Sequence, residues 1–294
     1  MLKQSEAGWG RDADVDTDGS VGSRFAEFHT GETAPCSARI ALDSRNAVCA
    51  SDDHNNPVAK YPSVLKVIIV RAPDRGQLRG QITGAKTVRT VAYPSKKNRE
   101  ARYGEGAAEI ERIKAEEVDI HIVKAIAQPC RIHALIDGWE NWATHIPDFS
   151  NLRDSGERVL IDAKRNWSDF RKPNGQRQSF LGQLAAEALG YRYERIVLGT
   201  MGSQVRRDNV DEIQASRFVH VPDHLVARAA AAVAKGPISL GNLADLLHPV
   251  NGRSMVYALM VRRIVEIDLE ARLTLGSECI AVKPLPLAMP SLRR

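Results

Sequence analysis

The 294-residue chain contains 41 Lys and Arg against 36 Asp and Glu, and 43% of its residues are hydrophobic. This is the composition of a globular protein, and the lack of any run of 18 apolar residues argues against a membrane span. Residues 1–60 carry a net charge of −4 and the whole chain +5, so residues 61–294 carry +9. A basic body favours a polyanion such as DNA as partner, although ordinary surface charge remains an alternative.

The four cysteines lie far apart and form no C-x-x-C pair. This spacing argues against both a zinc site and a disulfide framework. The first residues lack a basic stretch followed by an apolar core, so we expect no secretory signal. Together these features predict a cytoplasmic protein with reduced thiols and no membrane partner.

The N-terminal half divides into an irregular part and a patterned part. Residues 1–60 are rich in Asp, Ser, Gly, Asn and Ala and show no periodicity, which predicts a disordered or loosely ordered acidic leader. The β-branched run at 64–70 predicts a strand, and one or two more are expected between 77 and 93. Residues 94–98 then break the pattern. Apolar residues at helical spacing predict a helix over 105–119.

The middle of the chain predicts a mixed sheet. Strands are expected at 130–136, 144–149 and 158–164. A helix is expected at 176–189, followed by a strand at 191–198. The order helix, three strands, helix, strand is typical of an α/β core with a hairpin-rich sheet.

The C-terminal part has a different pattern. Helices are predicted at 224–235, 239–247 and 253–264, and two short strands between 265 and 282. Three helices followed by a strand pair are typical of a winged helix-turn-helix. We therefore predict a separate winged-helix-like domain over 222–294.

The sharpest chemical signal is Asp148 followed 14 residues later by Asp162-x-Lys164. Residues i and i+2 of a strand share a face, so Asp162 and Lys164 project together. A hairpin can bring Asp148 beside them, which gives two carboxylates and an ammonium around one point. The Asp-x-Lys motif alone is a weak indication of a catalytic site. The alternative is that these residues lie on the surface of an amphipathic hairpin.

Such a cluster suits phosphodiester cleavage. A divalent cation stabilises the charge of the transition state and activates water, and Mg²⁺ prefers oxygen ligands, with Mn²⁺ as an expected substitute. A lysine can orient the attacking water or neutralise the phosphate. His145, three residues before Asp148, could touch the phosphate, but we expect a structural or surface role for it.

A third carboxylate should come from the helix that precedes these strands. Glu105 and Glu109 lie four residues apart, where like charges mildly destabilise a helix unless a cation compensates. A solvated helix face is the alternative, and the residues alone do not choose between the two glutamates.

Basic residues follow the lysine strand and recur in the last predicted helix. The first group could hold phosphates, with a solvated loop as the alternative. The second group could grip DNA or serve a protein interface. The candidate DNA-binding residues are Arg165, Arg171, Lys172 and Arg177 in the first group, and Arg253, Arg262 and Arg263 in the second.

Four motifs together resemble the TnsA-type transposon endonucleases, a branch of the restriction-endonuclease-like nucleases. They are Gly104-Glu105-Gly106-Ala107-Ala108-Glu109, Gln128-Pro129, His145-Ile146-Pro147-Asp148-Phe149 and Val159-Leu160-Ile161-Asp162-Ala163-Lys164. In that family a Glu-x-x-x-Glu helix start precedes Gln-Pro by about 19 residues. The same spacing separates Glu109 from Gln128, which selects Glu109. Asp162 departs from the pattern, because relatives often carry Glu or Gln there.

The resemblance covers about residues 93–221 and extends weakly into the C-terminal region. It implies a nuclease domain over 61–221, with Glu109, Asp148, Asp162 and Lys164 as catalytic residues and the three carboxylates as metal ligands. It also implies cleavage of one strand at transposon ends, beside a transposase subunit and an ATPase regulator. The chain has no G-x-x-x-x-G-K-[ST] loop, so a partner would supply any ATPase.

Two other functions remain open from the sequence. A nuclease of the same fold could serve restriction or repair instead of transposition. A non-catalytic DNA-binding adaptor could keep a degenerate nuclease fold, and metal binding discriminates it from the enzymes.

Overall fold

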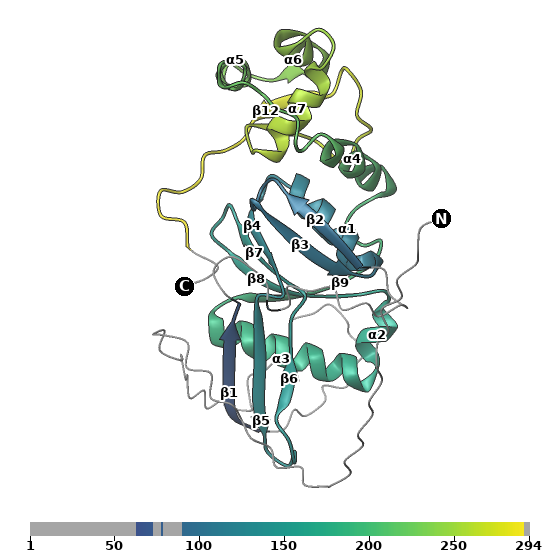
Figure 1. The fold of residues 1–294 in the computed structure, drawn as a ribbon, viewed down its shortest axis with the longest axis vertical. Helices are drawn as coiled ribbons and strands as arrows, with labels where there is room; N and C mark the ends of the chain where they lie inside the picture. Colours follow the sequence, from purple (N-terminus) through teal and green to yellow (C-terminus); the bar gives the residue numbers. More distant parts are fainter. Residues whose placement is uncertain (1–62, 73–77, 79–89, 291–294) are drawn as a thin grey trace, which may run out of the picture. The chain divides into compact units, whose positions relative to one another are not determined.

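The computed structural model describes residues 63–72, 78 and 90–290 (Figure 1). The predicted leader at 1–60 and any strand between 79 and 89 lie outside these residues. The first part of the described chain runs in the order β1 (Val64–Arg71), β2 (Thr90–Ser95), β3 (Glu100–Glu105), α1 (Ala107–Val118), β4 (Ile122–Ala127), β5 (Cys130–Ile136), β6 (Ala143–His145), β7 (Phe149–Arg153), β8 (Arg158–Lys164), α2 (Trp167–Arg171), α3 (Pro173–Leu189) and β9 (Arg192–Val197).

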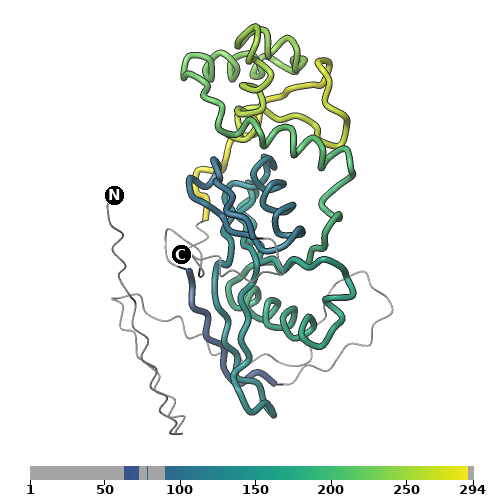
Figure 2. Tube along the Cα trace, turned by 45° about the vertical axis from the view of Figure 1, so that its right-hand side comes forward, coloured from purple at the N-terminus to yellow at the C-terminus, as the bar shows by residue number. Residues whose placement is uncertain are grey.

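The second part is mainly helical (Figure 2). It runs in the order α4 (Gln204–Ala215), α5 (Asp223–Val233), β10 (Ile238–Ser239), α6 (Leu240–Leu247), α7 (Gly252–Val261), β11 (Val265–Ile267) and β12 (Glu278–Ala281). No helix in the described ranges combines the length and apolar character that a membrane crossing requires.

The strands form several sheets, so the expected mixed α/β class is confirmed. The largest has the order β4-β7-β8-β9, antiparallel except for the parallel pair β8 and β9. A second antiparallel sheet has the order β1-β5-β6, and β2 and β3 form a hairpin. A small C-terminal sheet has the order β10-β12-β11.

Strand β8 is buried on both faces, which explains its strong apolar pattern. On one face Leu160 packs with Leu181 of α3, and on the other Ile161 packs with Ile113 of α1. The two helices therefore cover opposite faces of β8. The alternation expected of a strand is confirmed, with Leu160 on one side and Ile161 on the other.

Two sequence predictions differ from the structure in informative ways. The single strand expected at 144–149 is wrong: β6 ends at His145 and β7 begins only at Phe149, because Pro147 lacks an N–H and cannot continue the ladder. The break expected at 94–98 is instead the tight turn of the β2–β3 hairpin, and β2 continues through Pro94 to Ser95. Five elements were not predicted at all: β3, β4, α2, α4 and β10.

The C-terminal helices share a hydrophobic core with the end of α1. Val118 and Ile120 belong to the same buried cluster as Leu243 of α6 and Val256 of α7. Residues 256–261 of α7 are all buried. Helix α7 therefore packs inside the protein along most of its length.

Buried polar contacts tie the β2–β3 hairpin and β7 to α1. Glu116 of α1 is 1% exposed and accepts bonds from Arg102, Arg112 and Asn151. The Glu116 carboxylate neutralises the buried guanidinium of Arg102. Without Glu116, the charge of Arg102 would be buried and unpaired. These bonds fix the position of α1, the helix that carries Glu109.

We predict that Glu116→Ala destabilises the protein by about 3–5 kcal/mol, because it leaves the buried charge of Arg102 without a partner. Urea unfolding followed by circular dichroism measures this. Glu187→Ala on the exposed face of α3 is the control and should change stability by less than about 0.5 kcal/mol. A loss of similar size in both variants would contradict the structural role assigned to Glu116.

Candidate active site

Asp148 forms two hydrogen bonds with the backbone of β8. Its N–H donates to the carbonyl of Ile161 at 3.0 Å, and its Oδ2 accepts the N–H of Ala163 at 2.7 Å. The N–H of Gln128 donates to the carbonyl of Asp148 at 2.8 Å. Three motifs that lie far apart in the sequence, Gln-Pro, Pro-Asp and Asp-x-Lys, therefore meet at the junction of β4, β7 and β8.

Glu109 lies in the first turn of α1. Its Oε2 accepts the N–H of Glu105 at 2.9 Å, and a carboxylate is favoured at a helix N-terminus. Gly104 permits the close approach of β3, because a Cβ there would lie 2.9 Å from Cδ1 of Ile113 and 3.4 Å from Cβ of Glu109. The hairpin thus passes close to the turn that presents Glu109.

The pKa values of Glu109 and Asp148 are both shifted by burial and by nearby charges. Burial, and then the negative charge of Asp148, raises the pKa of Glu109 to about 8. Burial, and then the charge of Asp162, raises the pKa of Asp148 to about 7. The Lys164 ammonium acts in the opposite direction on both. Two carboxylates held together out of water need a proton or a cation between them.

Asp162 has different neighbours from those expected of an open metal ligand. It is 0% exposed, and Nε2 of His145 lies 2.9 Å from each of its oxygens. The hydroxyl of Tyr193 donates to Oδ2 at 2.6 Å. Both oxygens of Asp162 therefore contact protein groups. The contact also gives His145 an internal structural partner.

Tyr193 was not identified from the sequence. Its ring packs against α3 at Gly182, where a Cβ would lie only 2.4 Å from Cε2 of the tyrosine. In the parallel β8–β9 ladder Tyr193 is the register partner of Leu160. A glycine on a helix face and an aromatic residue on the following strand were the available signals, but neither points to Asp162 alone.

The carboxylate pair fits a divalent cation. Among the residues that the structure describes, no group of three or more His, Cys, Asp or Glu side chains is arranged to hold a metal ion. Glu109 and Asp148 nevertheless offer hard oxygen ligands in a site that disfavours two negative charges. Mg²⁺ commonly binds through one or two carboxylates and completes its shell with water and substrate phosphates.

The four candidate phosphate-binding residues after β8 are exposed: Arg165, Arg171, Lys172 and Arg177. Lys172 forms an ion pair with Asp169 at 2.6 Å. The other three have no ion-pair partner within residues 63–72, 78 and 90–290. These residues form a cationic surface that begins directly after Lys164.

The three C-terminal candidates are bonded within the protein. Arg253 pairs with Glu212 of α4 at 2.6 Å. Arg262 donates to a backbone carbonyl of the α4–α5 linker at 2.8 Å, and Arg263 donates to the carbonyl of Ile120 at 2.5 Å. Their guanidinium groups join α7 and its C-terminal turn to neighbouring elements.

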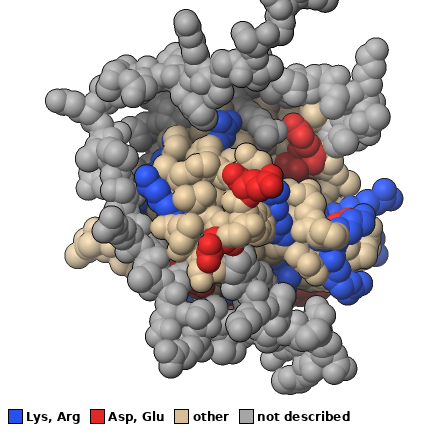
Figure 3. All heavy atoms as spheres, turned by 90° about the horizontal axis from the view of Figure 1, so that it is seen from below, with Lys and Arg blue, Asp and Glu red and all other residues tan. Residues whose placement is uncertain are grey.

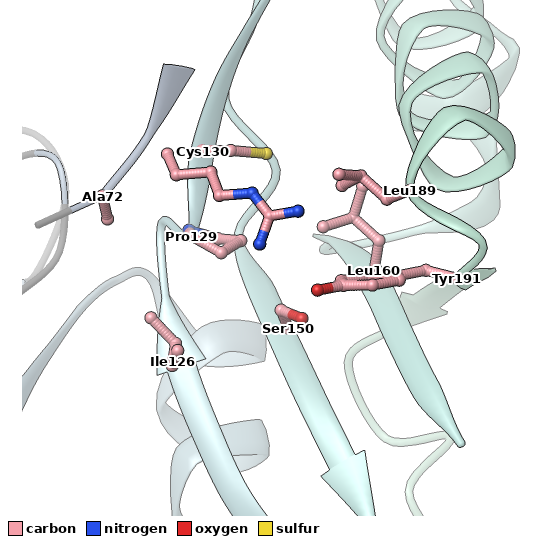
Figure 4. Close-up of a pocket in the computed structure, with 9 residues that line it drawn as sticks. Ala72, Ile126, Pro129, Cys130, Ser150, Leu160, Leu189 and Tyr191 are labelled. Carbon is pink, nitrogen blue, oxygen red and sulfur yellow. The ribbon is translucent and has the colours of Figure 1, made fainter. Parts of the chain in front are cut away.

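A separate small pocket lies between β1, β5, β7, β8 and the end of α3 (Figure 4). Its lining includes Arg71, Cys130, Ser150 and Tyr191, and none of the predicted catalytic residues. Burial raises the pKa of the Cys130 thiol to about 12, which keeps it protonated and unreactive. The thiol in this pocket is therefore not an activated nucleophile.

Comparison with protein-family models and with curated proteins finds no match for this chain.

We predict that Glu109→Gln and Asp148→Asn each raise the melting temperature at pH 8 in the presence of a chelator. Folding raises the two pKa values from 4.5 and 3.8 to about 8 and about 7, so the folded state holds more protons than the unfolded state in between. Stability from this pair is therefore lost as pH rises from about 4 to about 8. The amides remove a charge but can still accept the N–H bonds of Glu105 and Ala163.

Differential scanning calorimetry at pH 5 and pH 8 measures the effect. We expect a gain of at least about 2 °C at pH 8, corresponding to roughly 1 kcal/mol, and a smaller gain at pH 5. Glu187→Gln, on the exposed face of α3, is the control. Variants that melt like wild type at both pH values would show that the two carboxylates do not repel one another.

Proposed function

We propose that this chain is a Mg²⁺-dependent DNA endonuclease with a restriction-endonuclease-like core within residues 61–221. In this proposal it cleaves one strand at transposon ends, together with a transposase subunit and an ATPase regulator, as the resemblance to TnsA-type nucleases implies. One observation carries the proposal. Hydrogen bonds hold Asp148 against β8 beside Asp162 and Lys164, and burial raises the pKa of both Asp148 and Glu109, with Lys164 acting in the opposite direction on both.

The roles of these residues follow from their chemistry. Glu109 and Asp148 would hold the cation, which supplies Lewis-acid activation of the phosphate and of the attacking water. The Lys164 ammonium would stabilise the negative charge that develops on the phosphate. Arg165 and Arg171 can position the DNA backbone beside the site.

Asp162 contributes in a different way from the other carboxylates. His145 and Tyr193 occupy both of its oxygens, so we assign it to positioning rather than to direct metal binding in this arrangement. His145 lies three residues before Asp148 on the same segment. The bond from His145 to Asp162 therefore fixes the approach of that segment to β8.

The order α5, β10, α6, α7, β11, β12 and the sheet order β10-β12-β11 support the assignment of 222–294 to a winged-helix-like domain. The burial of α7 argues against its insertion into a DNA groove. Residues 222–290 carry seven Lys and Arg against six Asp and Glu, a weak charge for a DNA reader. These facts favour a protein partner for this domain over direct DNA contact through Arg253, Arg262 and Arg263.

Two alternative functions are compatible with the same site residues. A nuclease of the same fold in restriction or repair would show the same metal-dependent cleavage without a transposase. A non-catalytic adaptor would bind DNA but show no cleavage, and the intact carboxylates and lysine argue against it.

We predict that the wild-type protein nicks supercoiled plasmid DNA in Mg²⁺ or Mn²⁺, with its transposase partner where needed. Glu109→Gln, Asp148→Asn and Lys164→Ala should each lower the rate by more than the roughly 10- to 100-fold typical of a residue that only supports a metal ligand. Gel conversion of supercoiled to open-circular plasmid measures this. Arg253→Gln, outside the site, should retain activity.

The proposal fails if nicking continues in a chelator, or if the three site variants cleave as fast as wild type. It also fails if folded wild type shows no cleavage with either metal, with and without the partner.

A further inference from the structure

The three tryptophans that the structure describes are all exposed. Trp139 is 36% exposed, Trp142 39% and Trp167 46%. Tryptophan normally buries most of its large apolar ring. Exposed aromatic residues that gather on one part of a protein usually mark a binding surface.

Trp139 and Trp167 lie near the N-terminal end of α3, and Trp142 follows Trp139 by three residues. Trp167 begins α2, which contacts α3. Trp139 and Trp142 lie in the connection between β5 and β6, and β6 also contacts α3. The guanidinium of Arg177, on α3, lies 5.1 Å from the centroid of the Trp139 ring.

The same surface carries unpaired positive charge. Arg165 and Arg171 flank Trp167 in the sequence, are exposed, and form no ion pair with any residue of the described ranges. Figure 3 shows Lys and Arg side chains gathered on the side of the lower face where α2 lies. We call the set Trp139, Trp142, Trp167, Arg165, Arg171 and Arg177 the aromatic–arginine surface.

We propose that the aromatic–arginine surface binds unpaired bases of the DNA substrate. The preferred substrate is then DNA whose strands are locally open beside the cleavage site. This inference rests on the proposed nuclease function. Aromatic rings stack on bases of any sequence, and arginines hold the backbone phosphates of the same strand. Bases within a continuous duplex are already stacked and cannot use these rings.

The surface lies within reach of the active site. Trp167 is three residues beyond Lys164, so about 11 Å of extended chain is the greatest possible separation of their Cα atoms. Trp142 is six residues before Asp148, which limits that separation to about 20 Å. One DNA strand advances about 3.4 Å per nucleotide in a duplex, so both rings lie within about six nucleotides of the cut.

Charge favours DNA over a protein as the occupant. A protein–protein interface of this size would pair these arginines with acidic groups or bury them among apolar residues. Here Arg165 and Arg171 flank Trp167 in the sequence and Arg177 lies over the Trp139 ring, and such a combination of cationic and aromatic groups suits the phosphates and bases of a single strand. A second copy of this chain is the competing occupant, and the test below separates the two.

The test measures binding of the full-length protein to fluorescent oligonucleotides by anisotropy in a chelator, so that metal and cleavage play no part. Three probes are compared: a short single strand, the matching duplex, and the same duplex with an unpaired bubble. We expect wild type to bind the bubble and the single strand more tightly than the duplex. Trp167→Ala and Trp142→Ala should each weaken bubble binding by about 5- to 100-fold, with little change for the duplex.

Two matched variants separate stacking from other effects. Trp167→Phe keeps an aromatic ring and should retain part of the preference for the bubble. Phe218→Ala removes another exposed aromatic side chain, 52% exposed and outside this surface, and should change nothing. Normal melting of every variant excludes misfolding.

Equal binding of bubble and duplex by wild type overturns the inference, and so does unchanged bubble binding in the tryptophan variants. Sedimentation analysis in which wild type forms dimers and Trp167→Ala is monomeric, with DNA binding unchanged, would assign the surface to a second copy. A wild-type protein that nicks DNA but shows no preference for the bubble overturns only this inference. Absence of nicking with bubble preference intact overturns only the nuclease proposal.

Discussion

The bonds between Asp148 and β8 are the constraint on which the site depends. They hold the carboxylate against a strand that is buried on both faces, so its position is fixed by the core of the protein. Burial there disfavours the charged form of both groups, and packing nonetheless keeps them together. Such a conflict between local electrostatics and the fold is typical of functional sites, where the rest of the protein offsets the local loss of stability.

Much of the fold is readable from the sequence where periodicity is strong. The strand at 158–164 and the helix ending at Leu189 were predicted well, because each buries a continuous apolar face. Helix α4 was missed because its residues are mostly polar, with only Asn209, Val210 and Ile213 buried. Strand β3 was missed because its largest buried side chain is Arg102, whose partner Glu116 comes from a later helix. A single sequence does not reveal such long-range pairing.

The candidate site was also predictable from the sequence only in part. The motif spacing selected Glu109, and the strand pattern selected Asp148, Asp162 and Lys164; burial raises the pKa of Glu109 and Asp148 in the structure. The contacts of Asp162 were not predictable, since Tyr193 reaches it through the register of β8 with β9 and the close packing at Gly182. The arginines of the C-terminal region show why composition alone is insufficient. Arg262 and Arg263 lie beside a predicted recognition helix, yet both bond to backbone carbonyls.

Calorimetric titration of Mn²⁺ into the purified protein tests the central claim most directly, because it needs neither DNA nor a partner. We expect saturable binding by wild type and a loss of affinity of more than about 10- to 100-fold in Glu109→Gln and Asp148→Asn. Asp162→Asn, which alters the neighbouring buried carboxylate, should weaken binding less. Folded wild type that binds no Mn²⁺, or an Asp148→Asn variant that binds it as tightly as wild type, would contradict the account.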